Sequence, residues 1–319
     1  MLGNMEFYGA RAVNLSIASI TTAYNGAHIL PRQIDALLEQ SRPLQEIMII
    51  DNGSDDGTSA MLAERYPQVT ALRLPENLGA AGGWAAGLAY AALERGHDWV
   101  WNFDDDSVPS QSALESLLTG AGEFAADPQV GILAPLPVNV ASGTSYPPWL
   151  WREGFVKPGK DILQQPVWFA DLVVASGCMV RREVVDSIGL PRADFFMDFF
   201  DFEYCLRIRT KGYRIAVING CHFSHEIGDA RTIRFAGPSR VWSEHAPWRE
   251  YYVSRNATYI ARWLYPAFRT NRSVAIHLLR HATAILLFGS KKAASLKKMV
   301  QGVCDGWRGT LGIRFLPQQ

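Results

Sequence analysis

Strands and helices alternate along the first hundred residues of this chain. Apolar runs predict strands at residues 15–23, 46–50, 69–74 and 99–103, and helical spacing of apolar residues predicts helices over 28–40, from 59, and up to 93. Such an alternation is typical of a mainly parallel sheet with helices on both faces. We therefore predict an α/β fold, followed by a helical region after residue 240.

Three consecutive carboxylates, Asp104, Asp105 and Asp106, follow the fourth predicted strand. Open α/β sheets bind their ligands at the carboxyl ends of the strands. Adjacent carboxylates push one another toward protonation unless a cation or a solvated turn offsets their repulsion. Oxygen ligands of this kind suit Mg²⁺ or Mn²⁺, which proteins often hold together with the phosphates of a substrate. The alternative is that these acids cap the helix predicted after Ser110.

A glycine-rich segment, Asn77 to Gly83, follows the third predicted strand. Its spacing is not that of a dinucleotide-binding loop, and it does not follow the first strand, which argues against a Rossmann oxidoreductase. Glycine lets a backbone approach another group closely. The segment therefore either brings backbone near a ligand at the sheet edge or begins a helix that packs tightly on its neighbour.

A second acidic cluster, Asp198, Asp201 and Glu203, lies among five phenylalanines. Apolar surroundings raise the pKa of a carboxyl group, and a carboxylate so placed can accept the proton of a hydroxyl. Glu203 has an alternative role as the ion-pair partner of Arg207 one turn on, and Asp198 as the cap of a helix that starts near Phe199. Asp201 has neither alternative, so it is the candidate general base.

One histidine, His225, lies downstream of both acidic clusters in a polar segment. An imidazole can complete the ligand shell of a divalent ion, although a lone histidine is also a common buried structural group.

Between the two halves of the chain, proline-rich residues 136–165 predict a loop. Residues 167–181 then predict a strand, and residues 182–188 a helix.

The balance of charge bears on partners and location. Lysine plus arginine equals aspartate plus glutamate at 31 each, which argues against nucleic acid as a partner, although basic residues concentrate between Arg231 and Arg314.

The segment Ser273–Phe288 is too short to span a bilayer, so it is either an amphipathic helix on a membrane surface or one packed on the core. Widely spaced cysteines and the absence of an evident secretory signal predict a cytoplasmic location.

Several motifs together resemble inverting glycosyltransferases of family 2 with the GT-A fold. They are the Tyr24-Asn25 turn after the first strand, residues 51–58, the Asp104-Asp105-Asp106 strand end and the late acidic-aromatic helix. The similarity covers about residues 15 to 260. It implies an N-terminal extension over 1–14, a GT-A catalytic domain over 15–240 and a helical C-terminal region over 241–319. Within the catalytic domain, residues 15–135 would form the donor half and residues 136–240 the acceptor half.

The resemblance also implies roles for individual residues. Those implied to bind the nucleotide-sugar donor are Thr22, Tyr24, Asp51, Asn77, Gly79, Asp104 and Asp105. Asp104, Asp106 and His225 would hold Mn²⁺ or Mg²⁺, and Asp201 would be the catalytic base. The base would take the proton of an acceptor hydroxyl while the anomeric carbon is attacked from the face opposite the diphosphate, which inverts its configuration.

Two subgroups of the family are resembled. Residues 77–83 with the triple aspartate resemble bacterial galactofuranosyltransferases, which use UDP-galactofuranose. Residues 198–207, 225–229 and 248–256 resemble rhamnosyltransferases of O-antigen and capsule assembly, which use dTDP-rhamnose. Both imply a growing, lipid-linked cell-envelope glycan as acceptor, and peripheral contact with the cytoplasmic face of the inner membrane.

Two other functions remain open from the residues alone. A sugar-phosphate nucleotidyltransferase would carry a glycine-rich, arginine-containing loop after the first strand, where this chain has Thr22-Ala23-Tyr24-Asn25. A non-catalytic subunit that binds nucleotide-sugars would not need all the acids that this chain retains.

Overall fold

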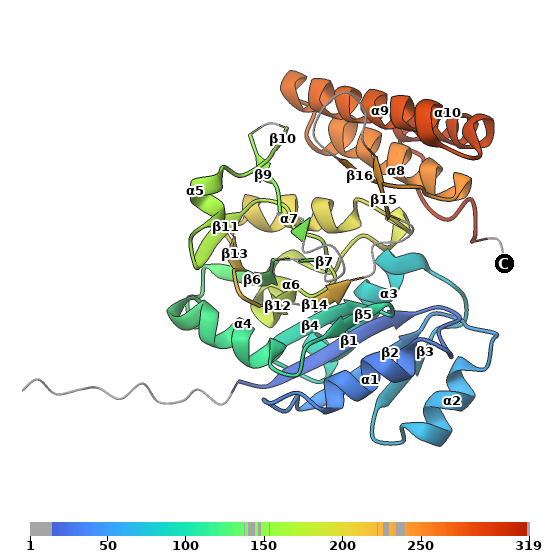
Figure 1. The fold of residues 1–319 in the computed structure, drawn as a ribbon. Coiled ribbons are helices and arrows are strands. Elements are labelled where there is room, and N and C mark those ends of the chain that lie inside the picture. The colour runs from blue at the N-terminus through green and yellow to red at the C-terminus, as the bar shows by residue number, and fades with distance from the viewer. Residues whose placement is uncertain are drawn as a thin grey trace, which may run out of the picture.

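The computed structural model describes residues 15–136, 138–139, 144–145, 148–152, 154–221, 223–225, 230–233 and 240–317. An eight-stranded sheet forms its centre (Figure 1). In spatial order its strands are β11 (Val167–Ala170), β13 (Arg214–Ile218), β6 (Val130–Pro135), β12 (Met179–Arg181), β4 (Trp99–Asp104), β1 (Ile17–Ala23), β2 (Glu46–Asp51) and β3 (Thr70–Arg73). Strands β3, β2, β1 and β4 run parallel, whereas β12 is antiparallel to both neighbours. The predicted α/β fold with a mainly parallel sheet is confirmed.

Helices cover both faces of the sheet because the side chains of each strand point alternately to either side. In β2, Ile47 and Ile49 belong to the apolar cluster that includes α1 (Leu30–Leu38), α2 (Thr58–Arg65) and α4 (Ala113–Ala121). Met48 belongs to the opposite cluster, which includes α3 (Gly79–Leu88), α6 (Arg182–Ile188) and α7 (Phe200–Thr210). Helix α6 occupies the residues that the sequence predicts.

Smaller elements connect and extend the main sheet. A four-stranded sheet is formed by β5 (Ser107–Pro109), β14 (Phe223–His225), β7 (Val138–Asn139) and β8 (Thr144–Ser145). Two hairpins and a short helix complete the set: β9 (Leu150–Trp151) with β10 (Phe155–Val156), β15 (Ala230–Ile233) with β16 (Arg240–Ser243), and α5 (Lys160–Leu163). Residues 136–165, predicted as a loop, therefore contain short strands and one helical turn among their described residues.

The apolar run 167–181 is not the single strand that the sequence predicts. Its first part, β11, lies at one edge of the main sheet, and its last part, β12, lies between β4 and β6. The segment between them leaves the sheet, and most of its apolar residues stay buried: Leu172 and Val173 are 0% and 4% exposed, although Val174 is 42% exposed. Because the segment is as apolar in sequence as the strands, the hydrophobic pattern alone does not reveal the break.

Three helices follow the last strand: α8 (Pro247–Tyr259), α9 (Phe268–Phe288) and α10 (Lys292–Arg308). They form a layer at one end of the molecule, drawn in orange and red in Figure 1. Helix α8 packs against both α9 and α10, and the Ser254 hydroxyl donates a 3.0 Å hydrogen bond to the Met299 carbonyl of α10. The predicted helical C-terminal region is confirmed, whereas the exact domain boundaries stay a prediction. Across the described residues, we find no helix with the length and apolar character needed to cross a bilayer.

Candidate active site

The register of the parallel strands brings several predicted site residues to one edge of the sheet. Thr22 of β1 lies opposite Asp104 of β4, and the next residue of β1, Ala23, lies opposite Asp51 of β2. Tyr24 follows directly and begins the turn after β1. The carboxyl ends of three neighbouring strands therefore meet, which is where open α/β sheets place their ligands.

The end of β4 is held in place by buried polar side chains. The Gln33 amide, fully buried on α1, donates hydrogen bonds of 2.5 and 2.6 Å to the carbonyl oxygens of Asp104 and Ser107. The Ser176 hydroxyl accepts a 3.1 Å hydrogen bond from the backbone N–H of Asp104 and lies 2.9 Å from the Ser107 hydroxyl. The loop between β11 and β12 thus fixes the strand end that presents the triple aspartate.

The three carboxylates do not cap a helix. Strand β5 follows them immediately, and α4 begins only at Ala113 with Ser112 before it. Asp106 is exposed, whereas Asp105 lies under the turn after β1, where the backbone N–H of Tyr24 donates a 3.4 Å hydrogen bond to its Oδ2. Burial, and the charges of Asp104 and Asp106 on either side, raise the pKa of Asp105 to about 7. A set of adjacent hard oxygen donors whose charges repel one another fits a bound divalent cation.

Asp51 is a buried carboxylate with several partners. Its Oδ1 accepts a 2.9 Å hydrogen bond from the backbone N–H of Ser54, and its Oδ2 accepts one from the Ser59 hydroxyl. The Arg73 guanidinium lies 3.4 Å from the same Oδ2. These contacts shape the turn after β2. Binding of the donor by Asp51 stays a prediction.

The glycine-rich segment is the beginning of α3 and not an open loop. The Asn77 side chain accepts a 2.8 Å hydrogen bond from the backbone N–H of Gly79 and a 3.1 Å bond from the Asn52 amide. Gly79 has a φ of +72°, and a Cβ atom there would lie 2.1 Å from the carbonyl oxygen of Phe196. Glycine is therefore needed for tight packing, which is the second of the two alternatives above. A contact of Asn77 or Gly79 with the donor stays a prediction.

The second acidic cluster occupies a turn of unusual backbone conformation. Phe196, Asp198 and Phe199 have positive φ values of 64°, 59° and 62°, although none is a glycine. Residues other than glycine rarely adopt this left-handed backbone conformation, and each one that does costs on the order of 1–3 kcal/mol. Helix α7 then begins at Phe200, so Asp201 lies in its first turn. The surrounding structure must hold this turn in place.

Asp201 combines burial with neighbouring negative charge. Burial is the main cause that raises the pKa of Asp201 to about 7, and the charges of Asp198 and Asp104 add to it, while a backbone hydrogen bond from Phe202 opposes it. The end of β4 therefore lies close enough to the start of α7 for the charge of Asp104 to act on Asp201. Within the described part of the chain, no lysine or arginine forms an ion pair with Asp201.

The two neighbouring acids are paired. The Arg207 guanidinium forms an ion pair of 3.0 Å with Glu203 one turn earlier, as the sequence predicts. Asp198 does not cap α7. The N-cap position is Phe199, and no side chain makes a capping hydrogen bond there. Instead, the Arg249 guanidinium of α8 binds both carboxylate oxygens of Asp198 at 2.8 to 3.1 Å. The charge of Asp198 in turn raises the pKa of Arg249.

Two fully buried residues of α8 hold the strained turn. The Asn256 amide donates hydrogen bonds of 2.7 to 3.0 Å to the carbonyl oxygens of Phe195, Met197 and Asp198. The Arg255 guanidinium donates to the carbonyl of Phe195 at 2.7 Å. Sequence reasoning assigned no role to Arg249, Arg255 or Asn256. The only signal was their presence in the rhamnosyltransferase-like stretch 248–256.

The backbone of His225 approaches the triple aspartate. Strand β14 pairs antiparallel with β5, and His225 lies opposite Ser107, the residue after Asp106. A role of His225 as metal ligand stays a prediction.

Comparison with known proteins agrees with this geometry. Residues 19–189 match the family model described as glycosyl transferase family 2. The chain is 25% identical over 303 residues to the dTDP-rhamnosyl transferase RfbF of Shigella flexneri, covering 94% of this chain and 98% of that protein. It is 24% identical over 222 residues to the galactofuranosyltransferase GlfT1 of Mycolicibacterium smegmatis, covering 66% and 71%.

Solved structures show the same fold. The crystal structure of S. aureus TarS 1–349 in complex with UDP has a TM-score of 0.53 and 14% identity, covering 92% of this chain and 83% of that one. This chain spans about half, 48%, of the longer TarS chain, which it matches with a TM-score of 0.57. The predicted GT-A fold is confirmed. Because the family model matches more than half of its residues, this chain belongs to glycosyl transferase family 2 and is a glycosyltransferase.

Proposed function

We propose that this glycosyltransferase moves rhamnose from dTDP-rhamnose to a hydroxyl group of a growing cell-envelope glycan, with inversion at the anomeric carbon. The observation that carries the proposal is the buried Asp201 at the start of α7, whose pKa is raised by burial and by the charges of Asp198 and of Asp104 at the end of β4. The similarity to RfbF supports the donor, because it extends over 94% of the chain, α8 to α10 included. UDP-galactofuranose is the second candidate donor, supported by the similarity to GlfT1 and by the triple aspartate.

Asp201 supplies the base. A carboxyl group with a pKa of about 7 is about half deprotonated at neutral pH. A general base is most effective when its pKa lies near the working pH, so Asp201 suits this role. Its position in the first turn of α7, beside the paired Asp198, leaves it as the acid that can take the proton of the acceptor hydroxyl. The hydroxyl oxygen then attacks the anomeric carbon, and the bond to the nucleoside diphosphate breaks on the opposite face.

The acids at the end of β4 fit a divalent cation. Asp104 and Asp106, with His225 opposite Ser107, would hold Mn²⁺ or Mg²⁺, whose positive charge offsets that of the departing diphosphate. Thr22, Tyr24 and Asp51 border the same edge and would contact the nucleoside. Asp105, whose Oδ2 accepts a hydrogen bond from the backbone N–H of Tyr24, would also take part in donor binding.

A donor panel tests this proposal. A ligand that binds only the folded state raises the melting temperature, so dTDP-rhamnose, UDP-galactofuranose and a GDP-sugar are compared with Mn²⁺ present. We expect stabilisation and turnover with dTDP-rhamnose and weaker effects with the others. Stabilisation by UDP-galactofuranose alone would favour the second candidate, and a response to the GDP-sugar alone would refute both.

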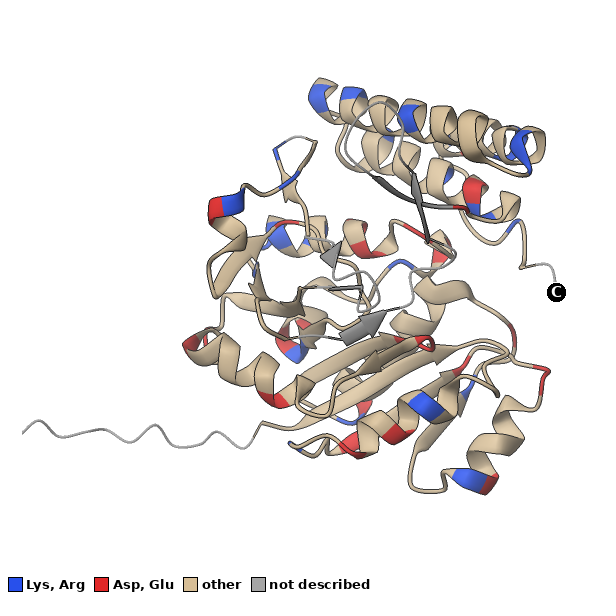
Figure 2. Ribbon diagram, viewed as in Figure 1, with Lys and Arg blue, Asp and Glu red and all other residues tan. Residues whose placement is uncertain are grey.

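The C-terminal helices offer a surface for a lipid-linked acceptor. Residues 251–304 contain nine lysines and arginines and no acidic residue. Figure 2 shows the blue bands of these bases on the helical layer. One side of α9 exposes Leu279 (69%) and Leu286 (53%) beside exposed Arg272 and Arg280. Exposed apolar side chains beside bases are typical of helices that lie on anionic membranes.

We accordingly propose peripheral contact of α9 and α10 with an anionic bilayer that presents the acceptor. Vesicles of phosphatidylglycerol should co-sediment the protein, and binding should fall as salt rises, since ions screen exposed charges. The variant Leu279→Ser/Leu286→Ser should bind less, whereas Leu38→Ser, which alters an exposed leucine of α1, should not. Equal binding to neutral vesicles, unaffected by salt or by these substitutions, would refute the membrane contact.

A further inference from the structure

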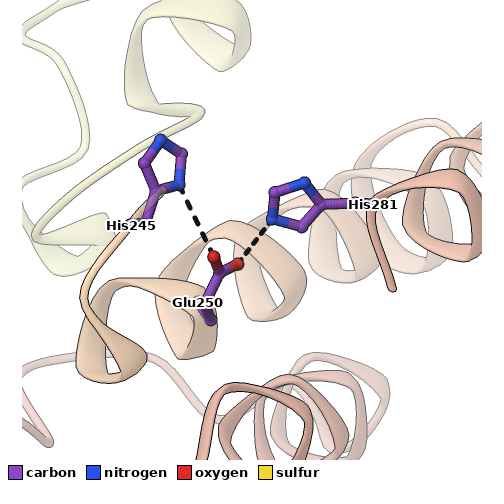
Figure 3. A group of neighbouring side chains, drawn as sticks. All are labelled: His245, Glu250 and His281. Atoms are coloured by element: carbon purple, nitrogen blue, oxygen red, sulfur yellow. Dashed lines mark hydrogen bonds and ion pairs between the residues drawn. The ribbon is translucent and has the colours of Figure 1, made fainter. Parts of the chain in front are cut away.

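A buried carboxylate with an imidazole near each of its oxygens lies in the C-terminal layer (Figure 3). Glu250, in the first turn of α8, has a side chain that is 2% exposed. Its Oε2 lies 2.6 Å from Nε2 of His281, in the middle of α9, and its Oε1 lies 3.8 Å from Nδ1 of His245, just before α8. The start of α8 and the middle of α9 thus meet at one carboxylate.

The charge of Glu250 and one nitrogen of His245 lack the partners that buried polar groups usually have. Among the described residues, no lysine or arginine forms an ion pair with Glu250, and Nδ1 of His245 is buried without a hydrogen-bond partner. A buried carboxylate is costly unless a cation and hydrogen bonds compensate it, and a buried polar atom without a partner costs free energy as well. A metal ion between the three groups would satisfy both requirements.

We propose that His245, Glu250 and His281 bind Zn²⁺. Two imidazoles and one carboxylate are a ligand set that zinc uses in proteins. The ligand atoms of the three residues lie within 4.8 Å of one another. Bonds of about 2.1 Å in tetrahedral geometry hold ligand atoms roughly 3.4 Å apart, so side-chain shifts of about 1 Å suffice.

The site differs in chemistry and in place from the one at the end of β4. Imidazole nitrogens favour zinc, copper and nickel, whereas the carboxylate-rich end of β4, with His225 as its single proposed imidazole, favours magnesium and manganese. The zinc site would join the start of α8 to α9. Because Arg249 precedes Glu250 and binds Asp198, the metal would also fix the arginine that faces the acceptor side of the active site. This inference goes beyond the proposed reaction and does not depend on the identity of its donor.

Calorimetry with Zn²⁺ on the full chain tests the proposal, in an Asp106→Ala background that weakens the other cation site. We expect one equivalent of Zn²⁺ to bind and to raise the melting temperature, and Mg²⁺ not to compete. His245→Gln and His281→Gln should each weaken zinc binding by on the order of tenfold or more. Co²⁺ in place of Zn²⁺ should give the intense visible absorption of a four-coordinate site, and both variants should lose it.

A matched control lies one turn away. The His277 ring stacks on that of His281 at 6.4 Å but is not part of the cluster, so His277→Gln should bind zinc as the unaltered chain does. Glutamine at 281 can still hydrogen-bond Glu250, which keeps the comparison independent of misfolding. Zinc affinity unchanged in both the 245 and the 281 variants would overturn the proposal. So would an unaltered chain whose melting temperature is the same with Zn²⁺ and with EDTA.

Discussion

Replacing Asp201 by asparagine should stabilise the folded protein at pH 8 while it slows sugar transfer. Burial raises the pKa of Asp201 to about 7, against 3.8 for an unperturbed aspartate. Between these two values the folded state binds more protons at this site than the unfolded state does. The free energy of unfolding therefore falls as the pH rises from about 4 to about 7, and the full penalty is present above pH 7.

The size of the penalty follows from the two pKa values. A difference of roughly three pKa units corresponds to about 4 kcal/mol at pH 8, and about 1.5 kcal/mol of this penalty is present at pH 5. Asparagine carries no charge and can still accept the hydrogen bond from the Phe202 N–H that Asp201 accepts at 2.8 Å. The variant should then gain up to about 4 kcal/mol in the free energy of unfolding at pH 8, and clearly less at pH 5.

Urea unfolding at the two pH values measures this difference, and turnover is measured on the same samples. Loss of a positioned base lowers turnover by on the order of 10² to 10⁴, while binding of the donor should stay. The control is Asp171→Asn, because Asp171 pairs with Arg152 and Arg209, and loss of a paired charge should lower stability at both pH values. A variant at Asp201 that is less stable at pH 8, or that transfers sugar normally, would refute the assignment.

Three further predictions follow from the same geometry. Asn256→Ala removes three hydrogen bonds to the turn before α7, so it should cost about 2–4 kcal/mol in urea unfolding and lower kcat more than it raises KM. Arg249→Lys cannot bind both oxygens of Asp198, so kcat should fall while far-UV circular dichroism stays the same; normal kcat would contradict this. Asp106→Ala should abolish the dependence of nucleotide-diphosphate binding on Mn²⁺ in calorimetry, and His225→Ala should weaken it less; equal affinity with and without EDTA in the unaltered chain would exclude the metal.

The parallel half of the fold was readable from the sequence because its signals are local. Each strand from β1 to β4 is a short apolar run, and each following helix shows its own periodicity. Parallel strands bring their carboxyl ends together, so Thr22, Asp51 and Asp104, which the family resemblance implies as donor residues, lie at one edge of the sheet. The break between β11 and β12 was not predicted because the connecting residues are as apolar in sequence as the strands, and most of them, such as Leu172 and Val173, are buried too.

The contacts of the second acidic cluster could be predicted only in part from the sequence, because some of them join residues far apart in the chain. Glu203 and Arg207 are neighbours on one helix, and their ion pair follows from spacing. Asp198 pairs instead with Arg249, which is 51 residues away and arrives through the docking of α8. The interpretation of Asp198 as a helix cap failed for this reason, since a local rule cannot anticipate a partner that tertiary packing supplies.

The docking of α8 links the C-terminal helices to the candidate active site. Three residues with positive φ precede Asp201, and their backbone strain, on the order of 1–3 kcal/mol each, must be compensated by the surroundings. Asn256 and Arg255 do this from α8, so any displacement of that helix would release the turn and move the candidate base. The same helix packs against α9 and α10, which carry the basic and apolar surface. The proposed contact of that surface with a membrane would therefore act on a layer whose position determines where Asp201 lies.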